Sequence, residues 1–324
     1  MGQRLKRYGR CVFSTGLLGI LTSAAAVSEQ NRGGSRGIDR SPIVLPGGSS
    51  VEFLELDSPA LRGKGQYSIF FPPSYRGGDG SYPVLYFLHG IFNDHTSWTD
   101  SEYGNMPAGV ERLMLDEKIP EMILVHPNGG RSFYTNYHDG SLRYEDFVVE
   151  ELVAHVESTH RARSGRQNRS IAGTSMGGYG ALKIAMRHPD LYAAVAAHSP
   201  IVFLGKNPLD VPPELRTSRR FAFFNEVFST VYGSPLDQAY YDANNPLVLA
   251  KSRDLDGLAI YFDYGTADQY NQLIQLGRGL QTLADILTEE RVPYEFREYA
   301  GEPHGWALVM GHLEKSMTFV SKTF

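Results

Sequence analysis

The chain has 324 residues, of which 42% are hydrophobic and 12% aromatic, so it can bury one large core or two small ones. Its formal net charge of −5 and its isoelectric point near 6.1 exclude the broad basic surface that nucleic-acid-binding proteins use. The sequence has no C-x-x-C pair, no H-E-x-x-H and no other tight group of ligand residues, so it gives no reason to expect a metal ion or another cofactor.

Residues 1–26 have the pattern of an export signal. Basic residues between positions 4 and 10 precede an uncharged run at 11–27, and Ala24-Ala25-Ala26 satisfies the small-x-small rule for cleavage. The alternative is an uncleaved membrane anchor, but serine, threonine and glycine interrupt this short apolar run. We therefore expect a secreted or periplasmic protein with no stable membrane anchor. Because Cys11 is the only cysteine, the cleaved chain would contain no disulfide.

Residues 27–49 are rich in glycine and serine, which predicts a flexible leader ahead of one domain at 50–324. Within that domain strand and helix signals alternate, and this alternation predicts an α/β fold with a mostly parallel sheet covered by helices on both faces. Strands are expected at 51–56, 66–71, 84–88, 122–125, 171–172, 193–197, 259–262 and 294–299, and helices at 144–160, 273–287 and 307–320.

A glycine-flanked serine separates the strand at 171–172 from a helical segment. In Gly173-Thr174-Ser175-Met176-Gly177, the order strand, serine turn and helix is typical of a nucleophile elbow. The turn is strained and crowded, so only very small residues fit two positions before and two positions after the serine. A chance match is the alternative reading, but the candidate partners that follow in the chain favour a nucleophile.

Residues 200–251 interrupt the strand and helix alternation. After Pro200 the segment contains five further prolines and many aromatic residues but no clear buried strand, and it lies between two predicted strands of the sheet. We expect a lid over the carboxyl end of the sheet, where the binding sites of open α/β folds form. The alternative is a structural excursion that packs on one edge of the sheet.

A serine nucleophile needs a base and an acid that orients the base. His304, in the loop after the last strand, is the best candidate base, whereas His126 and His198 are expected to be structural. Asp263 and Asp268 are the candidate acids. We prefer Asp268, since a loop position above the sheet lets it reach His304, while Asp263 lies within or at the end of a strand.

Acyl transfer also needs hydrogen-bond donors for a developing oxyanion. The backbone N–H of Met176, at the start of the elbow helix, is one candidate. The backbone N–H of Ile91 is the other, because Gly90 allows a tight turn directly after the strand at 84–88.

Together these residues resemble the putative-esterase family of α/β-hydrolases, which includes S-formylglutathione hydrolases, feruloyl and acetylxylan esterases, tributyrin-type esterases and mycolyltransferases. The resemblance runs from about residue 50 to 322. It implies an α/β-hydrolase fold, with Asp268 as the acid and Ile91 and Met176 as the oxyanion donors. The motifs that carry it are His89-Gly90-Ile91 with Trp98, Pro127-Asn128-Gly129-Gly130 with Ser132-Phe133-Tyr134, Tyr144-Glu145-Asp146-Phe147, Gly173-Thr174-Ser175-Met176-Gly177-Gly178, Gly265-Thr266-Ala267-Asp268 and His304-Gly305-Trp306.

The expected activity is hydrolysis of short-chain or aromatic acyl esters, of acetyl or feruloyl type and on small-molecule or carbohydrate alcohols, by Ser175, His304 and Asp268. Acyl transfer of the mycolyltransferase type, thioester hydrolysis of the S-formylglutathione type and a non-catalytic binding role are the alternatives. Substrate contacts are expected from loops and from aromatic residues of the insertion, although these phenylalanines could equally fill the core. The candidates are Phe92, Trp98, Asn128, Tyr134, Phe221, Phe223, Phe224 and Phe228.

Overall fold

The computed structural model describes residues 41–324 except 206, 209–210 and 212. The proposed signal and residues 27–40 of the proposed leader lie outside the described residues. Residues 41–49, which we had assigned to the leader, belong instead to the folded unit. Strand β1 (Ile43–Val44) pairs with β2 (Ser50–Ser58), Leu45 is buried, and the Ser49 N–H donates to Glu111 Oε1 at 2.9 Å.

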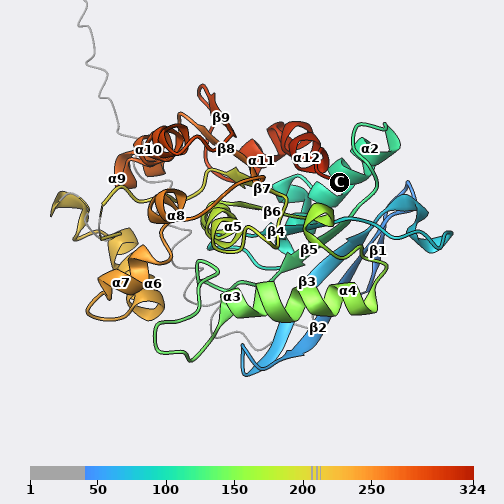
Figure 1. Cartoon of the computed structure of the whole chain (residues 1–324), viewed down its shortest axis with the longest axis horizontal. Coiled ribbons are helices and arrows are strands. Elements are labelled where there is room, and N and C mark those ends of the chain that lie inside the picture. Colours follow the sequence, from blue (N-terminus) through green and yellow to red (C-terminus); the bar gives the residue numbers. More distant parts are fainter. Residues whose placement is uncertain (1–40, 206, 209–210, 212) are drawn as a thin grey trace, which may run out of the picture. The chain divides into compact units, whose positions relative to one another are not determined.

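A nine-stranded sheet forms the centre of the described chain, in the order β1-β2-β3-β5-β4-β6-β7-β8-β9 (Figure 1). The first three strands and the β3–β5 pair are antiparallel, whereas β5, β4 and β6 through β9 run parallel. This arrangement confirms the predicted fold class. The other strands are β3 (Gly63–Phe71), β4 (Val84–Leu88), β5 (Ile123–Pro127), β6 (Arg169–Thr174), β7 (Ala194–His198), β8 (Ala259–Gly265) and β9 (Tyr294–Tyr299).

Helices cover both faces of this sheet, and the sheet divides the core into two apolar layers. One layer contains α3 (Tyr144–Asp146), the π-helical η4 (Phe147–Leu152), α4 (Val153–Thr159), α5 (Met176–Arg187), α6 (Arg219–Tyr232), α7 (Gln238–Asp242), α8 (Pro246–Ser252), α9 (Tyr270–Ile274) and α10 (Leu276–Glu289). The other contains α2 (Met106–Leu115), α11 (Trp306–Gly311) and α12 (Leu313–Ser321). Short 3₁₀ turns are η1 (Pro73–Arg76), η2 (Ser97–Thr99), η3 (Ser101–Tyr103), η5 (Arg166–Asn168) and η6 (Pro213–Leu215).

Two of the predicted helices are interrupted. The helix expected at 273–287 breaks at Gln275, whose φ of 56° is left-handed and separates α9 from α10. The Gly277 N–H there donates to Asn271 Oδ1 at 2.8 Å rather than to a helical carbonyl. The helix expected at 307–320 breaks at His312, whose φ of −121° and ψ of 18° are not helical and whose ring pairs with Glu302 at 3.0 Å.

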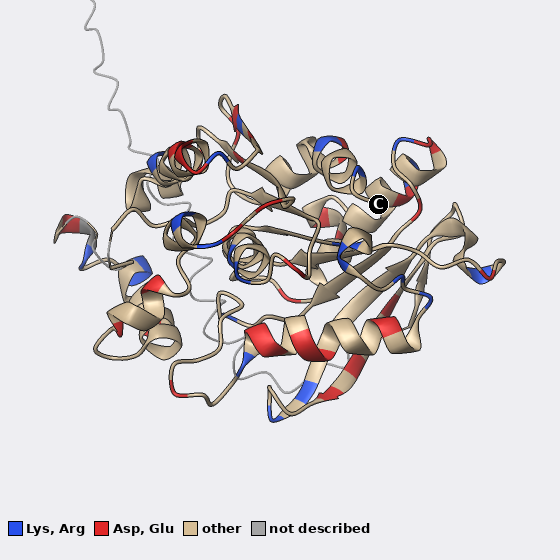
Figure 2. Ribbon diagram, in the orientation of Figure 1, with Lys and Arg blue, Asp and Glu red and all other residues tan. Residues whose placement is uncertain are grey.

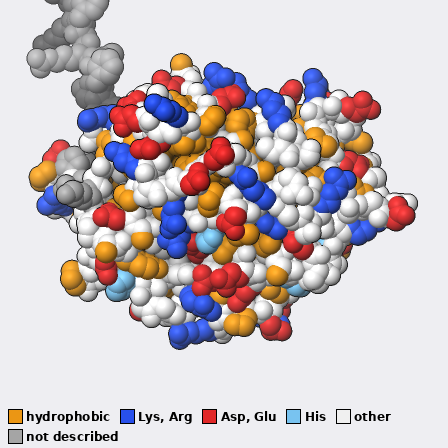
Figure 3. Space-filling model, in the orientation of Figure 1, with side chains coloured by type: hydrophobic (Ala, Val, Ile, Leu, Met, Phe, Trp, Pro, Cys, Tyr) orange, Lys and Arg blue, Asp and Glu red, His pale blue; other side chains and the backbone are white. Residues whose placement is uncertain are grey.

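Charged side chains of both signs are spread over the surface drawn in Figure 3, in keeping with the modest net charge. Figure 2 shows acidic bands along the helix formed by α3, η4 and α4. None of the helices in the described part of the chain has the length and apolar character needed to cross a membrane. The 200–251 insertion forms η6, α6, α7 and α8 between β7 and β8.

The sheet register brings the candidate site residues together at one edge. In the parallel strands Leu88 lies beside Gly173, Thr174 beside His198, and His198 beside Asp263. The loops that follow β4, β6, β8 and β9 therefore start from the same edge of the sheet.

Candidate active site

Ser175 occupies the sharp turn between β6 and α5. Its backbone has φ 59° and ψ −119°, a conformation that costs a non-glycine residue about 1–3 kcal/mol. The Ser175 N–H donates to the His198 carbonyl at 2.9 Å, which fixes the turn to the end of β7. A Cβ at Gly177 would collide with the Leu88 carbonyl, and one at Gly173 would collide with the Gly177 carbonyl. The strained elbow therefore requires both glycines.

The Asp268 and His304 side chains form a hydrogen bond above the same edge of the sheet. Asp268 lies in the loop after β8, and its Oδ2 accepts a hydrogen bond from His304 Nδ1 at 2.5 Å. The other oxygen, Oδ1, accepts the Tyr270 N–H at 2.8 Å, so the carboxylate is held at both ends. Because the carboxylate accepts a hydrogen bond from Nδ1–H, the other ring nitrogen, Nε2, carries the lone pair, and it has no partner among the described residues.

Ser175 and His304 line one pocket with a volume of about 180 Å³. Its walls come from the loop after β4, the elbow, the first turn of α6 and the loops after β8 and β9. The lining residues are Gly90, Ile91, Phe92, Asn93, Thr174, Ser175, Arg220, Gln269, Tyr270, His304, Gly305 and Trp306. The pocket therefore brings together the nucleophile and base candidates, the Ile91 loop and Phe92.

The loop after β4 passes directly over Ser175, the candidate nucleophile, since a Cβ at Gly90 would lie 3.5 Å from the Ser175 Cβ. Neither Ile91 N–H nor Met176 N–H has a backbone acceptor within the described part of the chain. The positions of both amides agree with the proposed oxyanion role, which stays a prediction.

The His89 side chain fixes the peptide that carries the Ile91 N–H. Its Nδ1–H donates to the Gly90 carbonyl at 2.8 Å, and its Nε2 accepts the Gly129 N–H at 2.9 Å. The roles are unambiguous because a carbonyl only accepts and an amide N–H only donates. Since the Gly90 C=O and the Ile91 N–H point in opposite directions from one planar peptide, holding the carbonyl aims the N–H. Burial lowers the pKa of His89 to about 4, so the ring is neutral at pH 7.

Tyr134 supports this loop from below, contrary to the expected contact with substrate. Its side chain is fully buried and does not line the pocket. The hydroxyl accepts the His89 N–H at 2.8 Å, and the ring leaves no space for a Cβ at Gly129 or Gly180. The Tyr134 carbonyl accepts from Lys183 Nζ at 2.5 Å. Tyr134 is therefore placed to position the loop over the nucleophile.

Lys183 belongs to a buried ionic group that ties α5 to α3. Its Nζ lies 2.7 Å from Glu145 Oε2, and the other carboxylate oxygen pairs with Arg187 and His188, each at 2.8 Å. Burial alone would raise the pKa of Glu145, but the surrounding positive charges and hydrogen bonds hold it well below its usual range. This group anchors the segment that carries Tyr134.

Two further expected substrate contacts are also corrected. Trp98 is fully buried and stacks on His126 with ring centroids 4.9 Å apart. Asn128 stabilises its own loop, since its N–H donates to the Gln66 carbonyl at 2.8 Å and its Oδ1 accepts the Gly130 N–H at 3.1 Å. Neither residue lines the pocket. A buried indole looks the same in sequence as an exposed one, which explains the error for Trp98.

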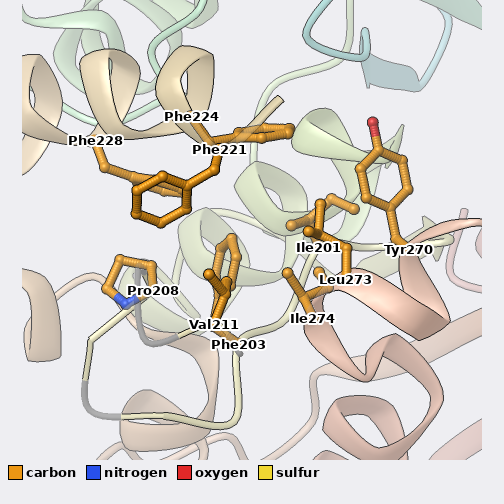
Figure 4. A pocket seen from close by; sticks show the side chains of 10 residues that line it. All are labelled: Ile201, Phe203, Pro208, Val211, Phe221, Phe224, Phe228, Tyr270, Leu273 and Ile274. Carbon is orange, nitrogen blue, oxygen red and sulfur yellow. The ribbon is translucent and has the colours of Figure 1, made fainter. Parts of the chain in front are cut away.

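Phe92 does line the pocket, with 60% of its side chain exposed, and it stacks on Phe223 of the insertion at 5.4 Å. Three other phenylalanines of the insertion lie elsewhere. Phe221, Phe224 and Phe228 line a narrow apolar crevice between α6 and α9 (Figure 4). Tyr270 lines both this crevice and the pocket of Ser175. These three side chains therefore pack beneath α6 rather than around the nucleophile.

Asp263, the less favoured acid, forms a second buried histidine–carboxylate pair. Its Oδ2 accepts from His198 Nδ1 at 2.9 Å and from the Tyr261 hydroxyl at 2.7 Å. It therefore joins β7 to β8 through buried side chains. The structural role expected for His198 agrees with this pairing.

Sequence reasoning missed several residues of the pocket. Gln269, Tyr270 and Trp306 directly follow the predicted acid and base, so their adjacency was an available signal. Arg220 gave no such signal, because it lies on a helix of the insertion far from any motif. No group of three or more histidine, cysteine, aspartate or glutamate side chains in the described chain is placed to hold a metal ion.

The parallel sheet, the strained serine turn and the loops that carry a histidine and an aspartate define an α/β-hydrolase. The profile of the family described as "Putative esterase" matches residues 58–313, and the chain belongs to that family.

Curated relatives are named esterase or S-formylglutathione hydrolase. "Esterase Rv1288" of Mycobacterium tuberculosis is 29% identical over 252 residues, which cover 72% of this chain and 51% of the relative. The chain thus spans about half the length of that relative. The S-formylglutathione hydrolase of Paracoccus denitrificans is 26% identical over 260 residues, with 76% of this chain and 84% of the relative covered.

Solved structures share the fold. A ferulic acid esterase superposes with a TM-score of 0.68 and 27% identity, and the match covers 85% of this chain and 98% of the esterase. An S-formylglutathione hydrolase from Agrobacterium tumefaciens also gives a TM-score of 0.68, at 18% identity, and covers 87% of this chain and 98% of its own.

A pair of matched variants should distinguish the roles of Asp268 and Asp263. We expect Asp268→Asn to lower kcat by up to about 10⁴-fold, because an amide at this position favours the wrong tautomer of His304. Asp263→Asn should lower the rate less than about tenfold but reduce the free energy of unfolding by about 1–3 kcal/mol, since it disturbs a buried pair. Steady-state kinetics and denaturant unfolding measure both effects, and a reversed pattern would show that Asp263 is the acid.

His89 should control the oxyanion loop, and two amide variants test each of its hydrogen bonds. His89→Asn keeps a donor near Nδ1 for the Gly90 carbonyl, whereas His89→Gln places its amide near Nε2. We expect the glutamine variant to lose about 100-fold in kcat and the asparagine variant clearly less, because a misaligned oxyanion donor costs about that much. Equal, wild-type kcat values in both variants would contradict this role.

The same histidine should affect acid stability. The folded state holds His89 neutral down to about pH 4, whereas an unfolded histidine takes up a proton near its ordinary pKa of 6.5. Between these values the unfolded chain binds more protons, so the His89 contribution to stability falls as the pH falls. The free energy of unfolding should therefore be measured as a function of pH between about pH 4 and pH 6.5. In this range its slope against pH should be shallower in both amide variants than in the wild type, by up to about 1.4 kcal/mol per pH unit.

Proposed function

We propose that this protein is an exported serine carboxylesterase that hydrolyses short-chain or aromatic acyl esters, with carbohydrate esters among its substrates. One observation carries the proposal: Ser175 lies on the strained elbow in the same pocket as His304, whose Nδ1 is bound to Asp268 and whose Nε2 has no partner within the described residues. The ferulic acid esterase among the structural neighbours supports the substrate class.

In the proposed reaction, His304 Nε2 takes the Ser175 proton as the serine oxygen attacks the ester carbonyl. The Ile91 and Met176 amides stabilise the oxyanion, and each donor contributes about 2.7–4 kcal/mol. The imidazolium, oriented by Asp268, then protonates the leaving alcohol. Water hydrolyses the acyl-enzyme by the same proton transfers in reverse.

The pocket favours small acyl groups. Its volume of about 180 Å³ lies below the range usual for drug-sized ligands. Tyr270 lines both this pocket and the apolar crevice under α6. We infer that its ring divides the two spaces and blocks a long acyl chain. Acetyl, butyryl and planar aromatic acyl groups fit this description better than lauroyl.

Thioester hydrolysis is a second candidate activity. The relative from Paracoccus denitrificans is named S-formylglutathione hydrolase, and the same acyl-enzyme chemistry serves esters and thioesters. Acyl groups and leaving groups must therefore be varied independently to separate the two activities.

The proposed nucleophile and substrate range can be tested together. Ser175→Ala should fold like the wild type, fail to react with a fluorophosphonate probe and lose about five to six orders of magnitude in kcat. For the wild type, kcat/KM should fall from acetyl and butyryl to dodecanoyl 4-nitrophenyl esters. Methyl ferulate and S-formylglutathione are assayed in the same way, as an aromatic ester and a thioester. Residual activity above a few per cent in Ser175→Ala would exclude the serine mechanism, and a preference for dodecanoate would contradict the small pocket.

Export is part of the proposal and is supported by the basic and apolar pattern of residues 1–26. After expression in a bacterial host, we expect the protein in the periplasm or medium, with an intact mass that corresponds to cleavage near Ala26. A full-length chain retained in the membrane fraction would support an uncleaved anchor instead.

A further inference from the structure

Arg220 lies beside the catalytic groups although it belongs to the insertion. It is an exposed residue in the first turn of α6, and it lines the same pocket as Ser175 and His304. Its guanidinium carbon lies 5.6 Å from the centroid of the Tyr270 ring, whose edge packs on the His304 ring at 4.6 Å. A single aromatic ring therefore separates this cation from the proposed base.

The charge of Arg220 is not neutralised within the described part of the chain. No carboxylate there lies within ion-pair distance of it, and no other permanently charged side chain lines the pocket. Asp268, the acid of the site, is buried behind the ring of His304 and already accepts two hydrogen bonds. The pocket therefore presents one positive charge to a ligand and no accessible carboxylate.

A second arginine adds positive charge at the rim of the pocket. Arg131 lies with its guanidinium carbon 5.1 Å from the Phe223 ring centroid, and Phe223 stacks on Phe92 at the pocket wall. Arg131 also has no carboxylate partner among the described residues. Acidic residues outnumber basic ones by 36 to 31 in the whole chain, yet the pocket and its rim carry two arginines and no accessible carboxylate.

An arginine held near an aromatic ring by a cation–π contact is well prepared to bind an anion. The contact favours one position of the guanidinium, whose N–H groups can then make a bidentate contact with a carboxylate. We propose that Arg220 selects esters that carry a carboxylate, on the acyl or on the alcohol side. This inference rests on the proposed esterase function and specifies its substrate class.

The test compares anionic esters with neutral esters of nearly the same shape. In the first pair, monoanionic 4-nitrophenyl hydrogen adipate carries its charge on the acyl side and is compared with its neutral methyl ester. In the second pair, the 4-acetoxybenzoate anion carries its charge on the alcohol side and is compared with its neutral methyl ester. The quantity measured is the ratio of kcat/KM for the anionic ester to kcat/KM for its neutral partner, because this ratio cancels differences in enzyme activity.

Arg220→Gln should lower this ratio about tenfold for at least one pair, mainly through KM, because a charge-assisted contact formed equally in the bound substrate and the transition state is lost. The pair that responds identifies the side of the ester that carries the charge. Arg220→Lys should recover part of the ratio. Arg219→Gln is the matched control: it removes the same charge from the preceding exposed residue of α6, which does not line the pocket, and should leave the ratio within about twofold of the wild type.

An unchanged ratio for both pairs in Arg220→Gln would overturn the inference, as would an equal loss in Arg219→Gln. The neutral esters report separately on the proposed function. If the wild type hydrolyses the neutral esters at the same rate as Arg220→Gln but shows no charge preference, only the inference fails. If the wild type hydrolyses no ester and resists the fluorophosphonate probe, the esterase function fails and the inference fails with it.

Discussion

The close approach of the serine turn to the end of β4 is the constraint on which the site depends. The Gly177 backbone packs so tightly against the Leu88 carbonyl that no side chain fits between them. This contact places the start of α5 directly beneath the loop that begins at His89. The strain at Ser175 is maintained because strands on both sides of β6 hold the turn, through packing against β4 and through the His198 carbonyl of β7.

Polar groups buried around this contact keep the loop over the nucleophile in one conformation. The His89 ring bridges two backbone segments, and the Tyr134 hydroxyl holds the backbone N–H of the same histidine. Lys183 and Glu145 then fix the segment that carries Tyr134. Each of these groups is buried and satisfied by specific partners, and such networks tend to fix a single arrangement. The chemistry of the pocket therefore depends on residues that no ligand in the pocket touches.

The central strands could be predicted from the sequence because they are continuous apolar runs, and the predicted 84–88 matches β4 at both ends. The predicted 294–299 also matches β9 at both ends, although β9 contains three charged residues and is only partly buried. The elbow and the loops of Asp268 and His304 could be predicted because each follows a predicted strand. The burial of Trp98 and Tyr134 could not be predicted from the sequence, since long-range packing decides whether an aromatic residue is buried. The helix break at Gln275 was missed because nothing in the local residue types requires a left-handed backbone there.

The pocket draws its residues from two sources that are independent in the chain. Ser175, Asp268 and His304 follow strands of the central sheet, whereas Arg220 belongs to an excursion between β7 and β8. Mutations in that excursion need not disturb the glycine contact under the serine. Selection on substrate preference can thus act on one segment while the reaction machinery stays constant, which gives a physical basis for divergence among proteins that share this scaffold.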